Sequence, residues 1–206
     1  MPTFASYDGT MLSYRVIGDG EPVICYPGGP GRSVDYLGDL GGLSKSRQLI
    51  LLDPRGVGES ADPADPASFR VNHLVNDLES LRVQLGLEQL DLLAHSAGSI
   101  LATLYAAAHP DRLSKLLLIT PGLVVDGVDD SEEQVQARLA SRASEPWYAT
   151  ALEAMEKIQA GSRSMEDYRA SRPFYYGRWD ETAQSHATSG VSERHQAARE
   201  GYFAGA

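Results

Sequence analysis

A serine in a short segment that also contains two alanines and a glycine occupies a predicted strand-to-helix turn in this chain of 206 residues. The segment reads Ala-His-Ser-Ala-Gly over residues 94–98, after an apolar run at 90–93 and before a helical stretch at 100–106. Such a turn holds a hydroxyl clear of the sheet and aims the following backbone N–H groups at the same point. The pattern therefore predicts a nucleophile at Ser96. A serine that only caps the helix is the alternative, but it leaves two neighbouring loops unexplained.

Two further loops follow predicted strands and could contribute to the same site. The first reads Pro-Gly-Gly-Pro-Gly over residues 27–31, and its glycines let backbone N–H groups turn toward a ligand. A tight loop without any chemistry is the alternative interpretation. The second covers residues 53–60, where an ion pair between Asp53 and Arg55 is expected to shape the loop without taking part in a reaction.

The elements that position these loops alternate between strands and helices. Apolar runs predict five strands, at residues 10–17, 22–26, 48–53, 90–95 and 115–120. The last three are continuously apolar, as parallel strands covered on both faces should be. Apolar residues recur at helical spacing between Val71 and Leu85, and residues 97–108 predict a second helix. The alternation indicates an α/β fold with a mostly parallel sheet flanked by helices.

The second part of the chain has a different texture. Residues 131–203 are rich in Ala, Glu, Arg and Ser and predict several short helices, with breaks near residues 145–146, 161, 173 and 190. This stretch predicts no strand. We therefore expect a core over residues 1–124 and a helical cap region over residues 125–206.

Composition narrows the class of protein. A net charge of -10 argues against a nucleic-acid or anionic-membrane partner. The single cysteine, Cys25, excludes an intrachain disulfide and is expected in the core. The first residues lack the basic start and apolar segment of a signal peptide, and no apolar run is long enough to span a bilayer. We expect a cytoplasmic enzyme that uses no metal ion and no cofactor.

The order and spacing of the three loops resemble the α/β-hydrolase superfamily. Residues 27–31 resemble the His-Gly-Gly-Pro-Gly signature of the prolyl aminopeptidases (proline iminopeptidases), and residues 53–60 are similar to their Asp-Gln-Arg-Gly-x-Gly-x-Ser loop. The segment His-Pro-Asp-Arg at 109–112 also resembles the superfamily. Two positions depart from the family pattern, because Pro27 replaces a histidine and Ala94-His95 replaces Gly-Gly.

The resemblance implies a serine hydrolase in which Ser96 forms an acyl-enzyme and the N–H groups of Gly29 and Ala97 form the oxyanion hole. It implies, above all, an aminopeptidase that releases an N-terminal residue such as proline from a small or short-peptide substrate. An esterase or lactonase on the same scaffold is the first alternative. The second, from another class, is a non-catalytic relative that binds a ligand or partner through the old pocket.

A smaller cue lies near the end of the sequence. Residues 199–203 are similar, with a gap, to a Glu-x-x-Tyr-Phe stretch of the prolyl aminopeptidase cap, where the glutamate binds the substrate's free amino group. The resemblance makes Glu200 a substrate-binding candidate, since a carboxylate suits an ammonium. A solvated glutamate near a helix end is the alternative. An unchanged KM for an N-terminal proline substrate in Glu200→Gln would contradict the substrate-binding role.

The partners that a nucleophilic serine needs are not assigned by the sequence. The superfamily places an Asp or Glu and then a His after the serine, following strands that come after the cap. No such strand, Gly-x-Asp loop or Gly-x-x-His turn follows residue 131. The possible replacements are His73, His95, His109, His186, His195 and Asp126. We assign no complete triad to them, and His95 is expected to point away from Ser96 because neighbouring side chains on a strand alternate.

The resemblance therefore predicts that the chain is a fragment. Its remaining strands, with the catalytic Asp and His, would be cut off or held in a second chain. The strand at residues 115–120 would then keep an open, apolar parallel edge, which invites pairing with another chain. A native protein whose intact mass matches 206 residues would contradict this prediction.

Overall fold

The computed structural model describes residues 1–121, 131–162, 164–188 and 195–204. The chain divides into two compact units, Met1–Val124 with Gly190–Ala206, and Val125–Ser189. The sequence predicts the same boundary after residue 124 but assigns the final residues to the cap region. They belong instead to the first unit, because helix α7 (Gln196–Tyr202) is bonded to loops of that unit.

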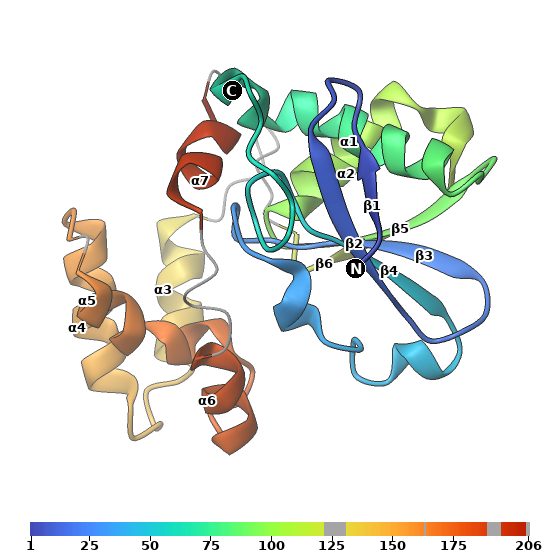
Figure 1. Cartoon of the computed structure of the whole chain (residues 1–206). Coiled ribbons are helices and arrows are strands. Elements are labelled where there is room, and N and C mark those ends of the chain that lie inside the picture. The colour runs from blue at the N-terminus through green and yellow to red at the C-terminus, as the bar shows by residue number, and fades with distance from the viewer. Residues whose placement is uncertain (122–130, 163, 189–194, 205–206) are drawn as a thin grey trace. The chain divides into compact units, whose positions relative to one another are not determined.

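The first unit is built on one mixed sheet with the strand order β1-β2-β4-β3-β5-β6 (Figure 1). The strands are β1 Thr3–Ala5, β2 Met11–Ile17, β3 Pro22–Tyr26, β4 Gln48–Leu52, β5 Leu90–His95 and β6 Leu113–Ile119. Strand β2 runs antiparallel to β1 and β4, whereas the pairs β3–β4, β3–β5 and β5–β6 are parallel. The predicted mostly parallel sheet is confirmed. Strand β1 was not predicted, because three residues are too few for a periodic signal.

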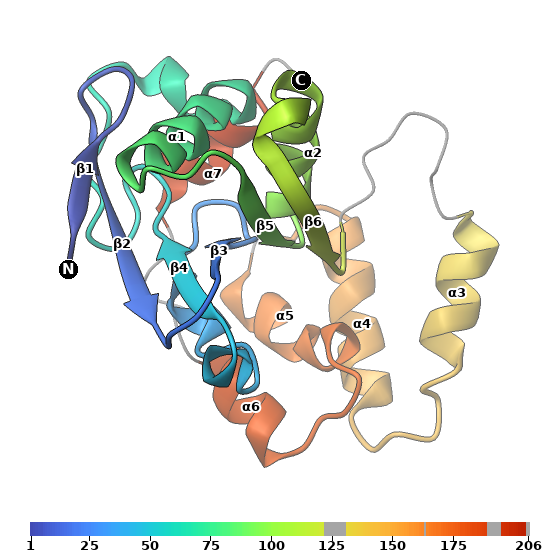
Figure 2. The ribbon, with the colours of Figure 1, turned by 90° about the vertical axis from the view of Figure 1, so that its right-hand side faces the viewer.

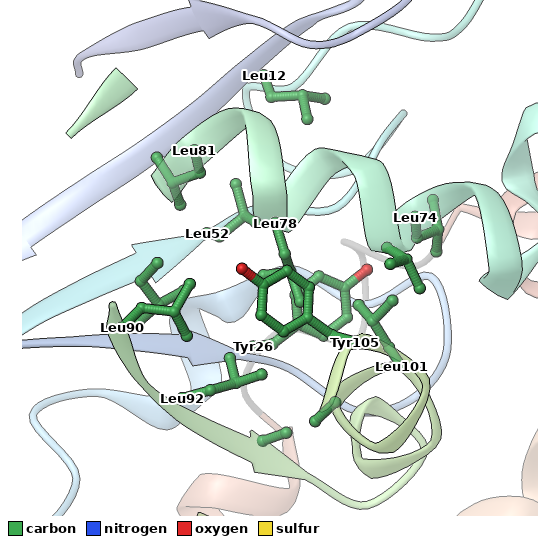
Figure 3. Close-up of a cluster of buried hydrophobic side chains, with 14 of the residues drawn as sticks. Leu12, Tyr26, Leu52, Leu74, Leu78, Leu81, Leu90, Leu92, Leu101 and Tyr105 are labelled. Atoms are coloured by element: carbon green, nitrogen blue, oxygen red, sulfur yellow. The ribbon is translucent and has the colours of Figure 1, made fainter. Parts of the chain in front are cut away.

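Successive residues of the inner strands face opposite sides of the sheet. Ile24 and Tyr26 belong to a core cluster with helices α1 (Val71–Gln84) and α2 (Gly98–Ala108), which lie on one side of the sheet (Figure 2). Figure 3 shows the α1 leucines facing strand and α2 side chains in this cluster. Val23 and Cys25 face the other side, covered by the segment with the 3₁₀ helices η1 (Val34–Leu37) and η2 (Leu43–Lys45). Burial on both faces fixes the register of these strands.

Cys25 gives a chemical test of this packing. Its side chain is fully buried, and burial raises the pKa of the thiol to about 12. Because the thiolate is the reactive species, we expect no reaction of the native protein with Ellman's reagent at pH 8. One equivalent should react after unfolding in guanidinium. Rapid reaction of the native chain would contradict the described packing of β3.

Strand β6 ends the sheet, and its free edge carries apolar side chains. Leu116, Leu117, Leu118 and Ile119 are each between 37% and 41% exposed. Because consecutive strand residues point to opposite faces, both faces of the sheet are open along β6. The open edge expected for this strand is therefore present in the described residues.

The second unit contains four α-helices and one 3₁₀ helix, η5 (Arg172–Tyr175), in its described residues. The α-helices are α3 Glu132–Ala140, α4 Tyr148–Gln159, α5 Met165–Ala170 and α6 Glu181–Thr188. A capping box at Ser131 begins α3, and Phe174 packs edge-on against Trp147 and Tyr148. The breaks expected at 145–146, 161 and 173 are confirmed, whereas position 190 lies outside the described residues. None of the helices in the described ranges has the length and apolar character needed to cross a membrane.

Candidate active site

Ser96 occupies the sharp turn between β5 and α2. Its backbone is in the left-handed region, with φ of 51°, and its N–H donates to the carbonyl oxygen of Ile119 at the end of β6. A left-handed serine costs about 1–2 kcal/mol relative to an ordinary conformation. Such strain is retained where the surrounding structure enforces it, and it clusters at functional sites. Thr120, at the end of the neighbouring strand, is also left-handed, with φ of 42°.

The glycine loop at residues 27–31 runs directly against this turn. Strands β3 and β5 are paired, with Tyr26 opposite Ala94, so the segments that follow them leave the sheet side by side. A Cβ added to Gly28 would lie 2.8 Å from the Cβ of Ser96 and 2.7 Å from the carbonyl oxygen of His95. Only a glycine fits at position 28. The structure therefore brings the loop and the serine together.

The two predicted oxyanion donors flank this contact. Gly29 has a φ of 123°, which glycine alone adopts without strain, and Ala97 directly precedes the first turn of α2. Within the described residues, neither N–H group donates a hydrogen bond to a protein acceptor. An N–H group without a protein acceptor is available to an anion, and the N-terminus of α2 adds its partial positive charge.

No base is bonded to the serine hydroxyl among the described residues. In the first unit, His73 contacts the Tyr7 hydroxyl and His109 packs on Tyr105. The ring of His95 is bonded to the hydroxyl of Tyr36, with Nδ1 and the oxygen 2.6 Å apart. His186 belongs to the second unit, and Asp126 lies outside the described residues.

His195 forms a pair with a carboxylate but not a catalytic pair. Its Nε2 lies 3.2 Å from Oδ1 of Asp62, and its Nδ1 accepts the N–H of Ala198 as the N-cap of α7. Both ring nitrogens are therefore used in holding α7, and neither is available to take the proton of a serine.

The expected ion pair between Asp53 and Arg55 is wrong. The fully buried Arg55 bonds Asp77 of α1 through two nitrogens, at 2.6 and 2.7 Å, and also pairs with Asp8. Asp53 instead accepts hydrogen bonds from the Ser33 hydroxyl and the Val34 N–H, both at 3.0 Å. Residue spacing suggested a local pair, but in the loop that follows β4 the two side chains bond to different partners.

The charges in this cluster of Arg55, Asp77 and Asp8 shift the pKa values of its members. Burial alone would raise the pKa of Asp8, but hydrogen bonds from Arg55 and Thr10 hold it at about 2. Burial opposes the charge of Arg55, yet the carboxylates of Asp77 and Asp8 raise its pKa above the ordinary value. Its ion pairs connect the turn between β1 and β2, the loop at residues 53–60 and helix α1, so the role of the cluster is structural.

Helix α7 packs on the site through one face and leaves Glu200 on another. The hydroxyl of Tyr202 donates to the carbonyl oxygen of Ala97 at 2.8 Å, and the N–H of His195 donates to Gly31 at 2.9 Å. Glu200 is exposed and accepts from the Gln196 amide at 2.8 Å. It is two residues from each of the buried Ala198 and Tyr202, on the opposite side of the helix. Its substrate-binding role stays a prediction.

Removing the Tyr202 hydroxyl should loosen this helix. In Tyr202→Phe we expect a loss of about 1 kcal/mol in the stability of the α7 contact, the usual net value of one hydrogen bond. Amide exchange in α7 should accelerate about fivefold, by the same free energy. Tyr14→Phe is the control, because the Tyr14 hydroxyl has no hydrogen bond among the described residues. Equal exchange in the two variants would contradict the contact.

The cavity beside the glycine loop is small, and the described residues offer no cluster of metal ligands. The cavity lined by Gly28, Gly98, Phe69 and Tyr202 has a volume of about 10 Å³, enough for a single water molecule. Among the described residues, no group of three or more His, Cys, Asp or Glu side chains is placed to hold a metal ion.

Curated proteins from several organisms are similar in sequence to slightly more than half of this chain. A proline iminopeptidase from Heyndrickxia coagulans is 37% identical over 123 residues, covering 58% of this chain and 43% of that protein. One from Saccharolobus solfataricus is 38% identical over 112 residues, covering 53% and 36%. A cis-3-alkyl-4-alkyloxetan-2-one decarboxylase from Shewanella oneidensis is 32% identical, covering 58% and 38%. The matches span only about two fifths of the length of these relatives.

Solved structures and a family model cover more of the chain. A hydrolase from Pseudomonas aeruginosa PA01 matches 97% of this chain and 70% of its own, with a TM-score of 0.63 and 18% identity. A Bacillus megaterium epoxide hydrolase matches 98% and 70%, with a TM-score of 0.63 and 17% identity. At such identity these neighbours show the fold alone. The model of the alpha/beta hydrolase fold matches residues 21–187, most of the sequence. The chain therefore belongs to the α/β-hydrolase fold family.

Proposed function

We propose that this protein is a serine hydrolase whose nucleophile is Ser96. The observation that carries the proposal is the left-handed Ser96 at the end of β5, with the glycine loop packed against its Cβ. A helix-capping serine needs neither feature. Both are expected where a hydroxyl must be exposed beside backbone donors.

The reaction follows from these groups. The Ser96 oxygen attacks the substrate carbonyl, and the carbonyl oxygen becomes an anion held by the N–H groups of Gly29 and Ala97. The C–N bond then breaks, the amine leaves with a proton, and an acyl-serine remains. Water attacks the acyl-serine, releases the acid and restores the hydroxyl. One oxyanion donor contributes about 3–4 kcal/mol of transition-state stabilisation in comparable enzymes.

For the substrate, we propose a peptide whose N-terminal residue, such as proline, is released. The support is the similarity to two proline iminopeptidases at 37% and 38% identity. A short-chain ester or lactone is the second candidate, and similarity to an oxetanone decarboxylase favours keeping it. Chromogen release from a prolyl amide but not from a short-chain ester would support the first candidate, and the reverse would support the second.

We also propose that the base and its carboxylate come from polypeptide that pairs along β6. Two observations support this. The exposed apolar edge of β6 lies next to the Ser96 turn, since Ile119 accepts the Ser96 N–H. In addition, the curated relatives extend well beyond the stretch that they share with this chain. An unactivated serine is a weak nucleophile, so the chain by itself should react slowly.

Labelling with a fluorophosphonate probe tests both proposals. The serine oxygen forms a bond to phosphorus while fluoride leaves, and the serine proton passes to the base. We expect Ser96→Ala to abolish labelling, with Ser99→Ala as the control, because Ser99 lies in the same segment but is buried. Labelling that persists in Ser96→Ala would contradict the nucleophile. Labelling of the 206-residue chain as fast as in a complete serine hydrolase would contradict the external base.

A further inference from the structure

One buried hydroxyl joins the glycine loop to the strand that carries the nucleophile. The Tyr36 oxygen accepts the N–H of Gly28 at 2.7 Å and lies 2.6 Å from Nδ1 of His95. Tyr36 is in η1 and is 9% exposed, and the Arg32 guanidinium lies over its ring, 3.7 Å from the centroid. Gly28 directly precedes the predicted donor Gly29, and His95 directly precedes Ser96.

We propose that Tyr36 is a positioning residue that sets the oxyanion loop against the nucleophile by accepting from Gly28 and donating to Nδ1 of His95. The backbone N–H of Gly28 can only donate, so it uses a lone pair of the Tyr36 oxygen. In the proposed arrangement the hydroxyl proton points along the short contact to Nδ1 of His95. A neutral imidazole accepts there when its own proton is on Nε2. Burial raises the pKa of Tyr36, so the phenol keeps the proton that it donates.

The geometry explains why this contact matters for catalysis. Oxyanion donors must lie 2.7–3.1 Å from the developing charge, and a misplacement of about 1 Å costs about a hundredfold in rate. A Cβ added at Gly28 would lie only 2.8 Å from the Cβ of Ser96, so the loop already lies close to the serine and a displacement takes it away from the serine. Without the Tyr36 hydroxyl, the N–H of Gly28 loses its partner. A buried N–H group without an acceptor favours a shift of the loop toward another acceptor or water, and this shift also displaces Gly29.

The first test measures the tautomer of His95 and needs no activity. Long-range ¹H–¹⁵N spectra of the native protein at neutral pH should show His95 with its proton on Nε2 and an unprotonated Nδ1. A proton on Nδ1 would mean that the imidazole donates to the tyrosine, and the proposal would be overturned. Because this measurement uses the unaltered chain, it holds whether or not any variant folds.

The second test compares Tyr36→Phe with Tyr14→Phe, whose hydroxyl has no hydrogen bond among the described residues. In Tyr36→Phe the Gly28 amide should exchange about tenfold faster, since a buried N–H has lost its acceptor. Amides of β3 and β5 should keep their protection, which establishes that the variant is folded. Tyr14→Phe should leave Gly28 unchanged. Equal protection of Gly28 in both variants would overturn the proposal.

The third readout depends on the proposed function and separates it from the positioning role. Tyr36→Phe should lower the maximal rate of fluorophosphonate labelling of Ser96 about tenfold. The probe concentration that gives half of the maximal rate should not change, because the hydroxyl orients the donors and does not touch the probe. Unaltered labelling together with faster Gly28 exchange would limit Tyr36 to a structural role and overturn the proposal. If the unaltered chain is not labelled at all, the proposed function fails, while the tautomer and exchange tests still decide the hydrogen-bond arrangement.

Discussion

Arg55→Ala is expected to lower the free energy of unfolding of the first unit by about 3–5 kcal/mol, the usual cost of removing one partner of a buried ion pair. Arg55 has no exposed surface, and Asp77, its main partner, is also buried. The substitution leaves a buried carboxylate without its cation and removes hydrogen bonds to Asp8 and Ser68. This is a large share of the 5–15 kcal/mol typical of a domain.

The measurement must follow the first unit specifically. Both tryptophans, Trp147 and Trp179, belong to the second unit, so their fluorescence reports the other part of the chain. Amide exchange in β4 and β5 during urea titration reports the unit that contains Arg55. Arg112→Ala is the control, because Arg112 is an exposed arginine of the same unit. The control should change stability by less than about 0.5 kcal/mol.

The same cluster predicts a dependence on acid. The folded pKa of Asp8, about 2, is below its ordinary value of 3.8. A depressed folded pKa adds stability above the unfolded pKa, and this contribution is lost as the pH falls through the folded one. The contribution of Asp8 should therefore be complete at neutral pH and decline between about pH 4 and pH 2. If the loss of stability in Arg55→Ala stayed constant down to pH 2.5, the ionised Asp8 carboxylate would not be the source of this contribution.

Local patterns predicted most of the core and failed where partners are distant in sequence. Strand β3 ends at the predicted residues, and α1 begins at the predicted Val71, because hydrophobic periodicity and glycine breaks act within a few residues. The Arg55–Asp77 pair could not be read from spacing, since 22 residues separate the two side chains and only packing joins them. A buried arginine needs carboxylate partners, but the sequence does not predict which carboxylates these are.

The candidate site shows the same limit. The Ser96 turn and the glycine loop could be predicted because each lies directly after a strand. The contacts that hold them could not, because Tyr36 comes from a segment for which no element was predicted and Tyr202 from the predicted cap region. Both tyrosines act through a single hydroxyl, which leaves no periodic signal. Tyr202 lies in the stretch that resembles the prolyl aminopeptidase cap, but that resemblance gives the functional role to the glutamate and not to the tyrosine.

Gly28→Ala is expected to slow labelling of Ser96 by more than about a hundredfold, because it displaces the oxyanion donors by an ångström or more. The new methyl group would lie 2.8 Å from the Ser96 Cβ and 2.7 Å from the His95 carbonyl oxygen. Neither neighbour can yield cheaply, since one is backbone and the other belongs to a strained turn. Overpacking of this kind costs about 1–3 kcal/mol of stability as well.

The control separates crowding from the general effect of replacing glycine. Gly177→Ala makes the same change where no atom lies within 4 Å of the new Cβ, and neither glycine has a left-handed backbone. It should leave labelling unchanged and alter stability by less than about 0.5 kcal/mol. If Gly28→Ala behaved like Gly177→Ala, the loop would have to be free to move without affecting Ser96. The glycine loop would then have no part in catalysis, and the oxyanion role of Gly29 would be lost with it.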